Sequence, residues 1–370
     1  MKRSVFQKRL SLFREKLAKI SPDAAWIIQP ENRRYLSGFK AEDTQLNESS
    51  GSLLLSHEAN FLFTDSRYVT EARKEARDFE ITLFNKGLLE GLPELIGSLG
   101  IKKLGFEEDH LTWGLHQKLA KNLRKLVLPV RLSPLKGLVE DMRVNKDKDE
   151  IRAMEASADL MSEVLDEVIE SLKPGLTEKS IAWQIEGLAR EKGADSLAFS
   201  SIVASGPNGA LPHAVPTTRK LGPGEPVVLD VGVKLDGYCC DMTRTIFLGK
   251  PNPKFRKIYK IVRQAQLAAL KEIRPGVEST YPDSVAREII KDAGYGEYFG
   301  HSLGHGVGMA THERPRLSPQ GPVTLQEGMV VTVEPGIYLP GKGGVRLEEM
   351  VVIEKNGPRI LTKERHFYNF

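Results

Sequence analysis

Apolar positions in the first 140 residues alternate between the spacing of a helix and that of a strand. Near the N-terminus, four apolar residues recur at helical spacing and predict one amphipathic helix: Phe6, Leu10, Phe13 and Leu17. Short apolar runs predict buried strands at residues 24–28, 52–56 and 60–64. Asp65 follows the third run and is expected to be the N-cap of the next helix. The alternation predicts a small α/β domain over residues 1–140.

A polar segment and a long helical pattern follow this first domain. Residues 141–150 are rich in charged side chains and are interpreted as a linker that leads into a helix ending near Leu172. Further on, Thr177 is expected to cap a helix that stops near Gly193, and a matching helix stops near Gly294. A chain of 370 residues exceeds the roughly 250–300 residues at which one core usually stops growing. We therefore expect a second domain over residues 151–370.

Two predicted strands of the second domain form a hairpin. They cover residues 227–231 and 238–243, and the dipeptide Asp236-Gly237 between them is typical of a two-residue turn. Such a turn places residue 230 opposite residue 243. Asp230 and Asp241 then become diagonal neighbours on one face of the hairpin, close enough to share an ion.

The second domain contains one pattern twice. Pairs of similar residues recur at offsets of 99 to 107 residues: Pro174-Gly175 with Pro275-Gly276, His213 with His312, Asp230 with Glu334, and Asp241 with Glu348. Two copies of one folding unit would face each other across a pseudo-twofold axis and bring these groups to one central pocket. His305 has no counterpart and adds a single imidazole.

Four carboxylates and one imidazole indicate a metal site. Without balancing charge the carboxylates would repel one another and shift toward their neutral forms, so a bound pair of divalent cations is expected. The oxygen-rich set suits manganese or cobalt, with iron or zinc as the other candidates; its members are Asp230, Asp241, His305, Glu334 and Glu348. Two ions about 3.5–4 Å apart can deprotonate a water molecule near neutral pH and polarise a carbonyl, which indicates hydrolysis of an amide or ester.

Single residues keep other interpretations at this point. Asp230 alone could be a core carboxylate with an arginine partner. His301 is either a donor to a developing oxyanion or a hydrogen-bonded core histidine. The glycines of residues 304–308 could suggest a nucleotide-binding loop, but histidines replace its phosphate-facing positions. Cys239 and Cys240 are interpreted as small packed residues.

Composition argues against several classes of function. Lys and Arg number 53 against 49 Asp and Glu, and a net charge of +4 is too balanced to indicate a nucleic-acid surface. No run of about 18 apolar residues predicts a membrane span, and the basic start of the chain lacks the apolar segment of a secretory signal. We expect no nucleic-acid or membrane partner and a cytoplasmic location.

Ordered motifs make the chain resemble a known family. They are Gly206-Pro-Asn208 through His213, Asp230-x-Gly232, Gly237-Tyr-x-x-Asp241-x-Thr-Arg-Thr245, His301-x-x-Gly-His305 through His312-Glu-x-Pro315, Glu334-Pro-Gly-Ile-Tyr338 and Gly344-Val-Arg346-x-Glu348. The set resembles the pita-bread metallopeptidases, and within them aminopeptidase P and prolidase, over essentially the whole chain. This resemblance implies an α/β N-terminal domain of the creatinase type. It also implies an α+β pita-bread (creatinase/aminopeptidase-like) catalytic domain with an internal pseudo-twofold repeat.

The resemblance also implies roles for single residues. The same five ligands would hold the metal ions, with Asp241 and Glu348 bridging both. Glu334 would also handle the proton of the attacking, metal-bridging hydroxide. Beside them, His213 would steady the tetrahedral intermediate and His312 would contact the substrate near the scissile bond. Three further residues would be substrate-binding groups: His301, Tyr338 at the proline pocket, and Arg346, which would also orient the neighbouring carboxylates.

The function that the resemblance implies is that of a metal-dependent Xaa-Pro aminopeptidase acting as a homodimer on proline-containing di- or oligopeptides. A Xaa-Pro dipeptidase (prolidase) is the alternative. It would clamp the free carboxylate of its substrate with a cation, for which Arg33, Arg34, Lys40 and Arg67 are candidates. A catalytically inactive relative acting as a binding or scaffold protein would have lost ligands, and none of the five is lost.

Overall fold

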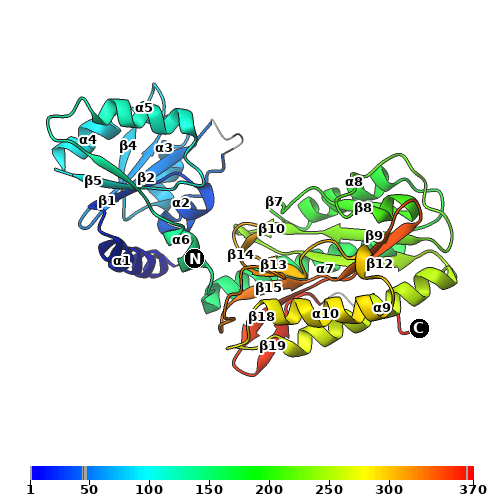
Figure 1. Cartoon of the computed structure of the whole chain (residues 1–370). Helices are drawn as coiled ribbons and strands as arrows, with labels where there is room; N and C mark the ends of the chain where they lie inside the picture. The colour runs from blue at the N-terminus through cyan, green and yellow to red at the C-terminus, as the bar shows by residue number, and fades with distance from the viewer. Residues whose placement is uncertain (1, 44, 46–47, 364–365) are drawn as a thin grey trace. The chain divides into compact units, whose positions relative to one another are not determined.

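The computed structural model describes residues 2–43, 45, 48–363 and 366–370. The chain divides into two compact units, Met1–Met142 and Arg143–Phe370. In Figure 1 the first unit is a twisted sheet flanked by helices, and the second unit combines several smaller sheets with long helices.

The first unit is built on a six-stranded sheet of order β4-β3-β2-β1-β5-β6. Its strands are β1 Ala24–Ile27, β2 Gly51–Ser56, β3 Asn60–Thr64, β4 Glu80–Leu83, β5 Lys103–Phe106 and β6 Arg131–Pro134. Its helices are α1 Arg3–Ile20, α2 Pro30–Ser37, α3 Val69–Glu75, α4 Leu92–Ser98 and α5 Trp113–Leu123. One face of the sheet packs Trp26, Leu54 and Phe63 against Ile96 of α4 and Leu119 of α5. The predicted α/β character of this region is confirmed.

Two details of the predicted elements in this unit are different in the structure. Strand β1 ends one residue early because the Ile28 amide donates to a Glu107 carboxylate oxygen at 2.6 Å, not to a neighbouring strand. The expectation that Asp65 caps the next helix is wrong, since α3 begins at Val69. The Asp65 carboxylate instead accepts a hydrogen bond from the Arg67 amide at 2.8 Å and pairs with the guanidinium of the same residue.

The stretch 141–150, expected to be a linker, is helical at both ends. Helix α6 spans Leu138–Arg143 and α7 spans Lys148–Ser171, so only four residues between them lie outside a helix. Asp147 and Glu150 form a reciprocal capping box that starts α7 within the predicted linker. The long helix itself ends where it was predicted, next to Leu172.

The second unit contains four sheets, of orders β12-β9-β8, β11-β10-β7, β14-β13-β15-β18-β19 and β16-β17. Strands of its first half are β7 Ser196–Leu197, β8 Ile202–Ser205, β9 Pro226–Val231, β10 Val233–Leu235, β11 Tyr238–Cys239 and β12 Met242–Phe247. Those of its second half are β13 Gly304–Gly306, β14 Glu313–Leu317, β15 Val330–Val333, β16 Gly336–Leu339, β17 Gly343–Arg346, β18 Glu349–Glu354 and β19 Gly357–Ile360. The remaining helices are α8 Glu178–Glu191, α9 Pro253–Glu272 and α10 Thr280–Asp292, with 3₁₀ turns η1 Gly206–Ala210 and η2 Gly296–Tyr298.

Backbone hydrogen bonds repeat between the two halves of this unit. The Gly175 amide donates to Leu221 O at 3.0 Å, and in the second half the Gly276 amide donates to Leu325 O at 2.9 Å. In each half, a second backbone hydrogen bond runs in the opposite direction between the same two segments. Thr177 caps α8 as predicted, and both α8 and α10 end two residues before the predicted stop glycines. The duplication in the sequence is therefore a duplication of structure.

The predicted hairpin has the predicted register. Thr243 lies opposite Asp230, and Asp236 and Gly237 both have positive φ, of 49° and 80°, as a two-residue turn of this type requires. The strands are interrupted at Gly232, where an added Cβ would collide with the Cys240 carbonyl oxygen. Asp241 lies at this interruption, between β11 and β12.

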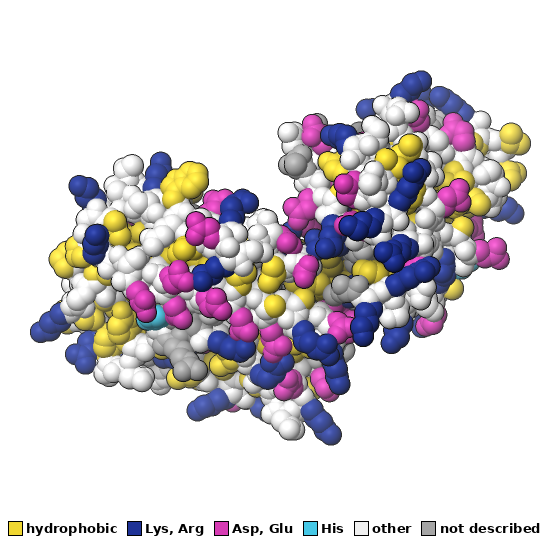
Figure 2. Space-filling model, turned by 180° about the vertical axis from the view of Figure 1, so that it is seen from behind, with side chains coloured by type: hydrophobic (Ala, Val, Ile, Leu, Met, Phe, Trp, Pro, Cys, Tyr) yellow, Lys and Arg dark blue, Asp and Glu magenta, His cyan; other side chains and the backbone are white. Residues whose placement is uncertain are grey.

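Helices α9 and α10 cover the large sheet of the second half. Val331 and Val351 of that sheet pack with Ile258 and Val262 of α9 and Ile290 of α10. None of the helices in the described part of the chain combines the length and low polarity that crossing a bilayer requires. On the face shown in Figure 2, basic and acidic side chains are interspersed over each unit, as the nearly balanced composition predicts.

Candidate metal centre

All ten site residues predicted from the sequence line one cavity of about 580 Å³ in the second unit. They are Asp230, Asp241, His305, Glu334 and Glu348, the expected ligands, and His213, His301, His312, Tyr338 and Arg346 around them. Both halves of the unit contribute, because β9 and the segment before β12 bring the aspartates while the sheet of the second half brings the glutamates and His305. The Glu348 amide donates to Thr243 O at 3.0 Å, which joins the two halves beside the cavity.

His305 lies on a strand that is tightly enclosed. A Cβ at Gly304 would collide with the Thr332 carbonyl oxygen, and one at Gly306 would collide with Arg314 O. Glycines on both sides of His305 therefore let β13 lie close to β15 and β14. This close packing holds the imidazole at the centre of the cavity.

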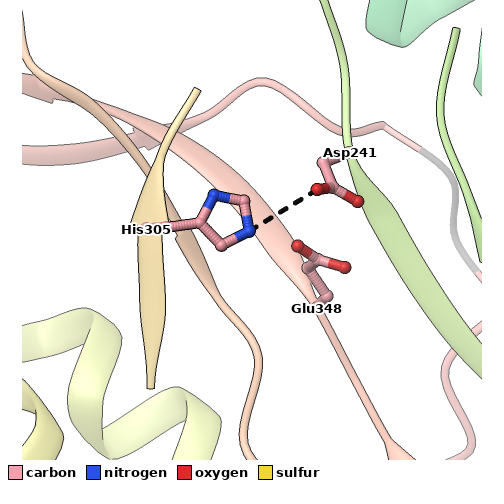
Figure 3. Close-up of side chains that lie close together, drawn as sticks. All are labelled: Asp241, His305 and Glu348. Atoms are coloured by element: carbon pink, nitrogen blue, oxygen red, sulfur yellow. Dashed lines mark ion pairs between the residues drawn. The ribbon is translucent and has the colours of Figure 1, made fainter. Parts of the chain in front are cut away.

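Side chains from three separate strand ends converge there. Ligand atoms of Asp241, His305 and Glu348 all lie within 4.8 Å of one another, and Figure 3 shows these side chains pointing toward a common centre. His305 Nε2 is 3.7 Å from Asp241 Oδ2 and 3.4 Å from Glu334 Oε1. The other ring nitrogen, Nδ1, lies 3.1 Å from Gly306 O and donates to it, so Nε2 of a neutral ring presents a lone pair to the carboxylates.

Burial and mutual repulsion make the ionised carboxylates unstable unless a cation balances their charge. Burial first, and then repulsion by Glu348, raise the pKa of Asp241 well above its usual range. Burial and then Glu334 do the same to the pKa of Glu348, and burial raises the pKa of Glu334 to about 8. Asp230 Oδ1 and Glu348 Oε1 are buried without a hydrogen-bond partner in the described part of the chain. Unpaired oxygens and a bare imidazole nitrogen around one point fit divalent metal ions.

Arg346 organises the carboxylates on one side of the cavity. Its Nη2 donates to Asp230 Oδ2 at 2.5 Å, and its Nε donates to Thr243 Oγ1 at 3.2 Å. Thr243 Oγ1 in turn donates to Glu348 Oε2 at 2.8 Å. The buried guanidinium thus fixes Asp230 directly and Glu348 through Thr243.

His301 and Tyr338 continue this hydrogen-bonded chain. Arg346 Nη1 donates to Tyr338 Oη at 2.8 Å, and Tyr338 Oη lies 2.9 Å from His301 Nε2. Because His301 Nδ1 donates to Ser302 O at 2.8 Å, the tyrosine hydroxyl is the donor to Nε2. Burial lowers the pKa of His301 to about 4, so the ring is neutral. His301 is thus hydrogen-bonded through both nitrogens, as in the core-histidine interpretation, while its ring still lines the cavity.

His213 and His312 line the cavity from exposed positions. The His312 ring centroid is 4.3 Å from that of His305. Next to His312, the buried Glu313 carboxylate pairs with Arg143 and with Lys146, and accepts from the Ala310 amide at 3.0 Å. These contacts tie the segment that carries His312 to the start of the unit.

The sequence analysis missed one cation in the cavity, Arg316. It lies on β14 directly opposite His305, and its charge lowers the pKa of His312 after burial has done so. The alternation of buried and exposed residues along Glu313–Leu317 identifies this strand. Residues 301–315 were interpreted as one motif-bearing segment, so the strand pairing that places Arg316 beside His305 was not expected.

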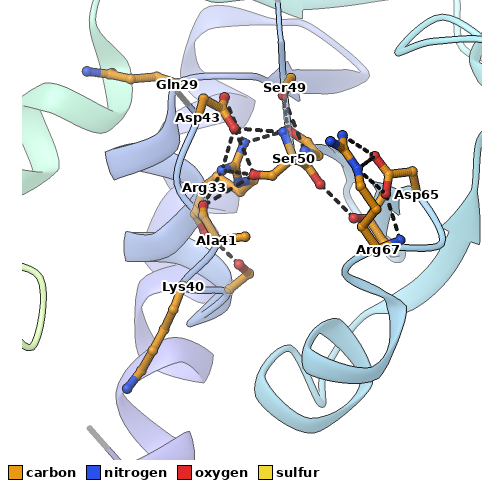
Figure 4. Close-up of polar contacts among 12 residues, drawn as sticks. Gln29, Arg33, Lys40, Ala41, Asp43, Ser49, Ser50, Asp65 and Arg67 are labelled. Atoms are coloured by element: carbon orange, nitrogen blue, oxygen red, sulfur yellow. Dashed lines mark hydrogen bonds and ion pairs between the residues drawn. The ribbon is translucent and has the colours of Figure 1, made fainter. Parts of the chain in front are cut away.

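Two of the four candidate cations of the first unit, Arg33 and Arg67, are engaged in its own fold. The Arg33 guanidinium is fully buried and donates to Gly51 O at 2.6 Å, to Ala41 O at 2.5 Å and to the Asp43 carboxylate (Figure 4). Arg67 pairs with Asp65 in the same view. Arg33 stabilises the loop that follows α2 and is not free to bind a substrate.

Comparisons with known proteins agree with this geometry. Residues 152–355 match the model of Metallopeptidase family M24, and residues 9–145 match the Creatinase/Prolidase N-terminal domain. A "Xaa-Pro dipeptidase" of Pyrococcus horikoshii is 36% identical, covering 97% of this chain and 98% of that protein.

Solved structures show the same architecture. The structure "Xaa-Pro dipeptidase from Bacillus anthracis" has a TM-score of 0.90 at 35% identity and covers 97% of this chain and 98% of its own. The X-Pro aminopeptidase of Thermotoga maritima MSB8 has a TM-score of 0.84 at 36% identity, covering 94% and 97% of the two chains. The fold is the expected α/β creatinase-type domain followed by a pita-bread catalytic domain. The chain is therefore a metallopeptidase and belongs to family M24.

Proposed function

We propose that this protein is a Xaa-Pro dipeptidase, which hydrolyses the bond between a first residue and a C-terminal proline. The observation that carries the proposal is one cavity lined by the five expected metal ligands, three of them with ligand atoms within 4.8 Å of one another, and by an arginine, Arg316. Proteins named Xaa-Pro dipeptidase that resemble this chain over nearly its full length support the same substrate class. Proline lacks an amide hydrogen and has a fixed φ, so such a bond requires a dedicated pocket.

Five side chains would hold two divalent ions, manganese or cobalt by the hardness of the donor set: Asp230, Asp241, His305, Glu334 and Glu348. Asp241 and Glu348 would bridge the ions, as the family resemblance implies. Glu348 Oε1, which is buried without a hydrogen-bond partner in the described part of the chain, supports its role. When bound, the ions would lower the pKa of a water molecule and polarise the scissile carbonyl.

The protein's own groups would do the remaining work. Glu334 would take the proton of the attacking water and pass it on toward the leaving nitrogen of proline. His213 and His312, on the cavity wall, would donate to the oxyanion and to the substrate near the scissile bond. Arg346 would keep Asp230 and Glu348 in place through the contacts described above.

Arg316 would select the length of the substrate. A dipeptide carries a free carboxylate one residue from the scissile bond, and a guanidinium binds a carboxylate with two parallel hydrogen bonds. Among the described residues no carboxylate pairs with Arg316, so its charge is available to the cavity. This observation favours the dipeptidase over the aminopeptidase that the sequence alone led us to expect.

An Xaa-Pro aminopeptidase is the second candidate, supported by the similarity to the Thermotoga structure. Three peptides separate the two functions: Leu-Pro, Leu-Pro-amide and Leu-Pro-Gly-Gly, assayed with added manganese or cobalt after metal analysis of the protein. The amide differs from the dipeptide only in the carboxylate. Cleavage of Leu-Pro far above both others supports a dipeptidase, whereas equal cleavage of the tetrapeptide identifies an aminopeptidase. If no peptide is cut by protein that holds both ions, the proposal fails.

The homodimer implied by the resemblance and the cytoplasmic location expected from the composition belong to the same proposal. Light scattering coupled to size-exclusion chromatography tests the dimer against the 41.2 kDa mass of one chain.

A further inference from the structure

The loop that carries His213 has little regular structure of its own. It follows β8, begins with the short turn η1, and continues to Arg219 without a strand or α-helix. Five consecutive residues of this loop, from Pro212 to Pro216, line the cavity. A loop of this kind places a side chain accurately only when other contacts order it, because ordering each residue costs conformational entropy.

One buried carboxylate, Glu178, holds the loop near its beginning and at its end. Its Oε1 accepts from the Ser205 amide and from Ser205 Oγ, both at 2.7 Å. Its Oε2 accepts from the Thr217 amide at 3.0 Å and from Thr217 Oγ1 at 2.6 Å. Asn208 Nδ2 donates to both oxygens, at 3.1 and 2.9 Å.

The chemistry of these contacts requires an ionised acid. Six contacts from donors fill the acceptor sites of one carboxylate, and no neutral side chain offers as many. Glu178 is the first residue of α8, where the helix dipole favours negative charge. Burial acts to raise the pKa of Glu178, but hydrogen bonds from Thr217 and Ser205 outweigh it and leave the pKa below its usual range.

The second half of the unit has a simpler arrangement at the equivalent place. The Glu178 amide donates to Arg219 O, and the equivalent bond in the second half runs from the Ser279 amide to Val323 O. Ser279 Oγ accepts a hydrogen bond from the Val323 amide at 3.1 Å. Thr177 caps α8, so the carboxylate of Glu178 is not needed for the cap, and its hydrogen bonds described above all come from residues 205–217.

We propose that Glu178 is a positioning residue, which orders residues 205–217 and thereby sets His213 against the cavity. The proposal rests on the function proposed above for His213. It also makes a structural claim about the loop that is measured without any substrate.

Glu178→Gln tests that claim. The glutamine keeps the shape, but its amide group must face either the Ser205 or the Thr217 backbone N–H, and a donor cannot satisfy a donor. We expect faster hydrogen exchange of the Ser205 and Thr217 amides in the full-length protein, with unchanged exchange in the core of α9. Glu186→Gln, on the same helix and paired among the described residues only with Arg190, is the matched control and should leave the loop unchanged. Unchanged exchange of the loop in Glu178→Gln overturns the proposal.

Kinetic measurements test whether Glu178 affects catalysis by positioning His213. Glu178→Gln should lower kcat/KM for Leu-Pro by about 10- to 100-fold, at unchanged metal content, because a misplaced group costs about that much. In a His213→Ala background the same change should have almost no further effect, since the group to be positioned is gone. An equal loss in both backgrounds overturns positioning of His213.

A milder variant keeps the test valid if Glu178→Gln does not fold. Thr217→Val removes the hydroxyl that donates to Glu178 and accepts from Asn208 and the Arg219 amide, but it leaves the backbone amide bond to Glu178, so a smaller change in the same direction is expected at both the loop and kcat/KM. If the unaltered protein cleaves no Xaa-Pro peptide, the proposed function fails while hydrogen exchange still decides whether Glu178 orders the loop.

Discussion

His305 Nε2 lies 3.4 Å from Glu334 Oε1. The imidazole has its proton on Nδ1, where Gly306 O accepts it, so its Nε2 lone pair faces a carboxyl oxygen in the centre of the cavity. Such a contact is stable when a cation lies between the two atoms. We therefore expect bound metal to affect the stability of the site more than any substitution at the rim of the cavity.

Metal binding should stabilise the folded protein. Manganese or cobalt at about 100 times its dissociation constant should add about 2.7 kcal/mol to the free energy of unfolding, because the ions bind only the folded cavity. Glu348→Gln should lose most of this gain and bind fewer ions, since it removes a charge from the shared centre. Thermal unfolding with and without metal, with metal analysis, measures both effects. The exposed Glu354→Gln at the end of β18 is the control, and an equal metal response of Glu348→Gln would contradict the ligand assignment.

Replacing Arg346 should lower both the free energy of unfolding and the rate of peptide hydrolysis. Arg346→Met leaves the Asp230 carboxylate buried without its partner, and breaking a buried pair costs about 3–5 kcal/mol. Arg359→Met removes a partly exposed guanidinium and should cost about 1 kcal/mol or less. Urea unfolding of the metal-free proteins compares the two. Similar losses in both variants would show that Arg346 does not organise the site.

Arg316 should matter only for substrates with a free carboxylate. Arg316→Gln should raise KM for Leu-Pro by roughly 10- to 100-fold, in line with about 1.5–3 kcal/mol for a hydrogen bond to a charged group. Hydrolysis of Leu-Pro-amide should be unaffected. Steady-state kinetics on the two peptides gives the answer, with Arg190→Gln on α8 as the control. An equal loss of hydrolysis of both peptides would mean that Arg316 supports the fold of β14 and does not bind the substrate carboxylate.

The free energy of unfolding should decrease as pH rises because of Glu107 in the first unit. Burial raises the pKa of Glu107 to about 7, above the ordinary value of 4.5. Between these values the folded protein keeps a proton that the unfolded chain has lost, so the free energy of unfolding decreases as pH rises through this window, by about 3 kcal/mol in total. Below about 4.5 the contribution is complete, and above about 7 it is gone.

Glu107→Gln should remove this decrease in the free energy of unfolding with rising pH, whatever its effect on stability averaged over the pH range. Unfolding in urea from pH 5 to 8 can be followed by the fluorescence of the buried Trp26, in a Trp183→Phe background that removes the tryptophan of the second unit. Glu108→Gln, at the exposed neighbouring position, is expected to keep the slope. A slope unchanged by Glu107→Gln would assign the pH dependence to other groups.

The sequence predicted the parts of this molecule that follow from local rules and from duplication. The turn residues Asp236 and Gly237 determined the hairpin register, and that register placed Thr243 opposite Asp230 as observed. The four repeated carboxylates, together with His305, are five predicted residues that the structure brings to one cavity. Recurrence at a fixed offset was informative because both copies must bury the same faces.

Features that depend on a choice between local contacts or on strand pairing could not be predicted from the sequence. Asp65 has the residue type of a helix cap, yet it pairs with Arg67 and the helix begins later. The chain from Arg346 through Tyr338 to His301 depends on how β16 and β17 pair, which no spacing reveals. Arg316 was missed for a similar reason, because its place beside His305 comes from strand pairing and not from a motif.

Because both halves of the second unit line the cavity, bound ions would hold the halves together as well as supply the chemistry. Asp230 and Asp241 come from one half of the second unit, and His305, Glu334 and Glu348 from the other, so neither half holds a complete site. Pulling the halves apart would require breaking bonds to the cations. When a cell depletes its divalent metals, this protein should therefore become not only idle but also easier to open and to degrade.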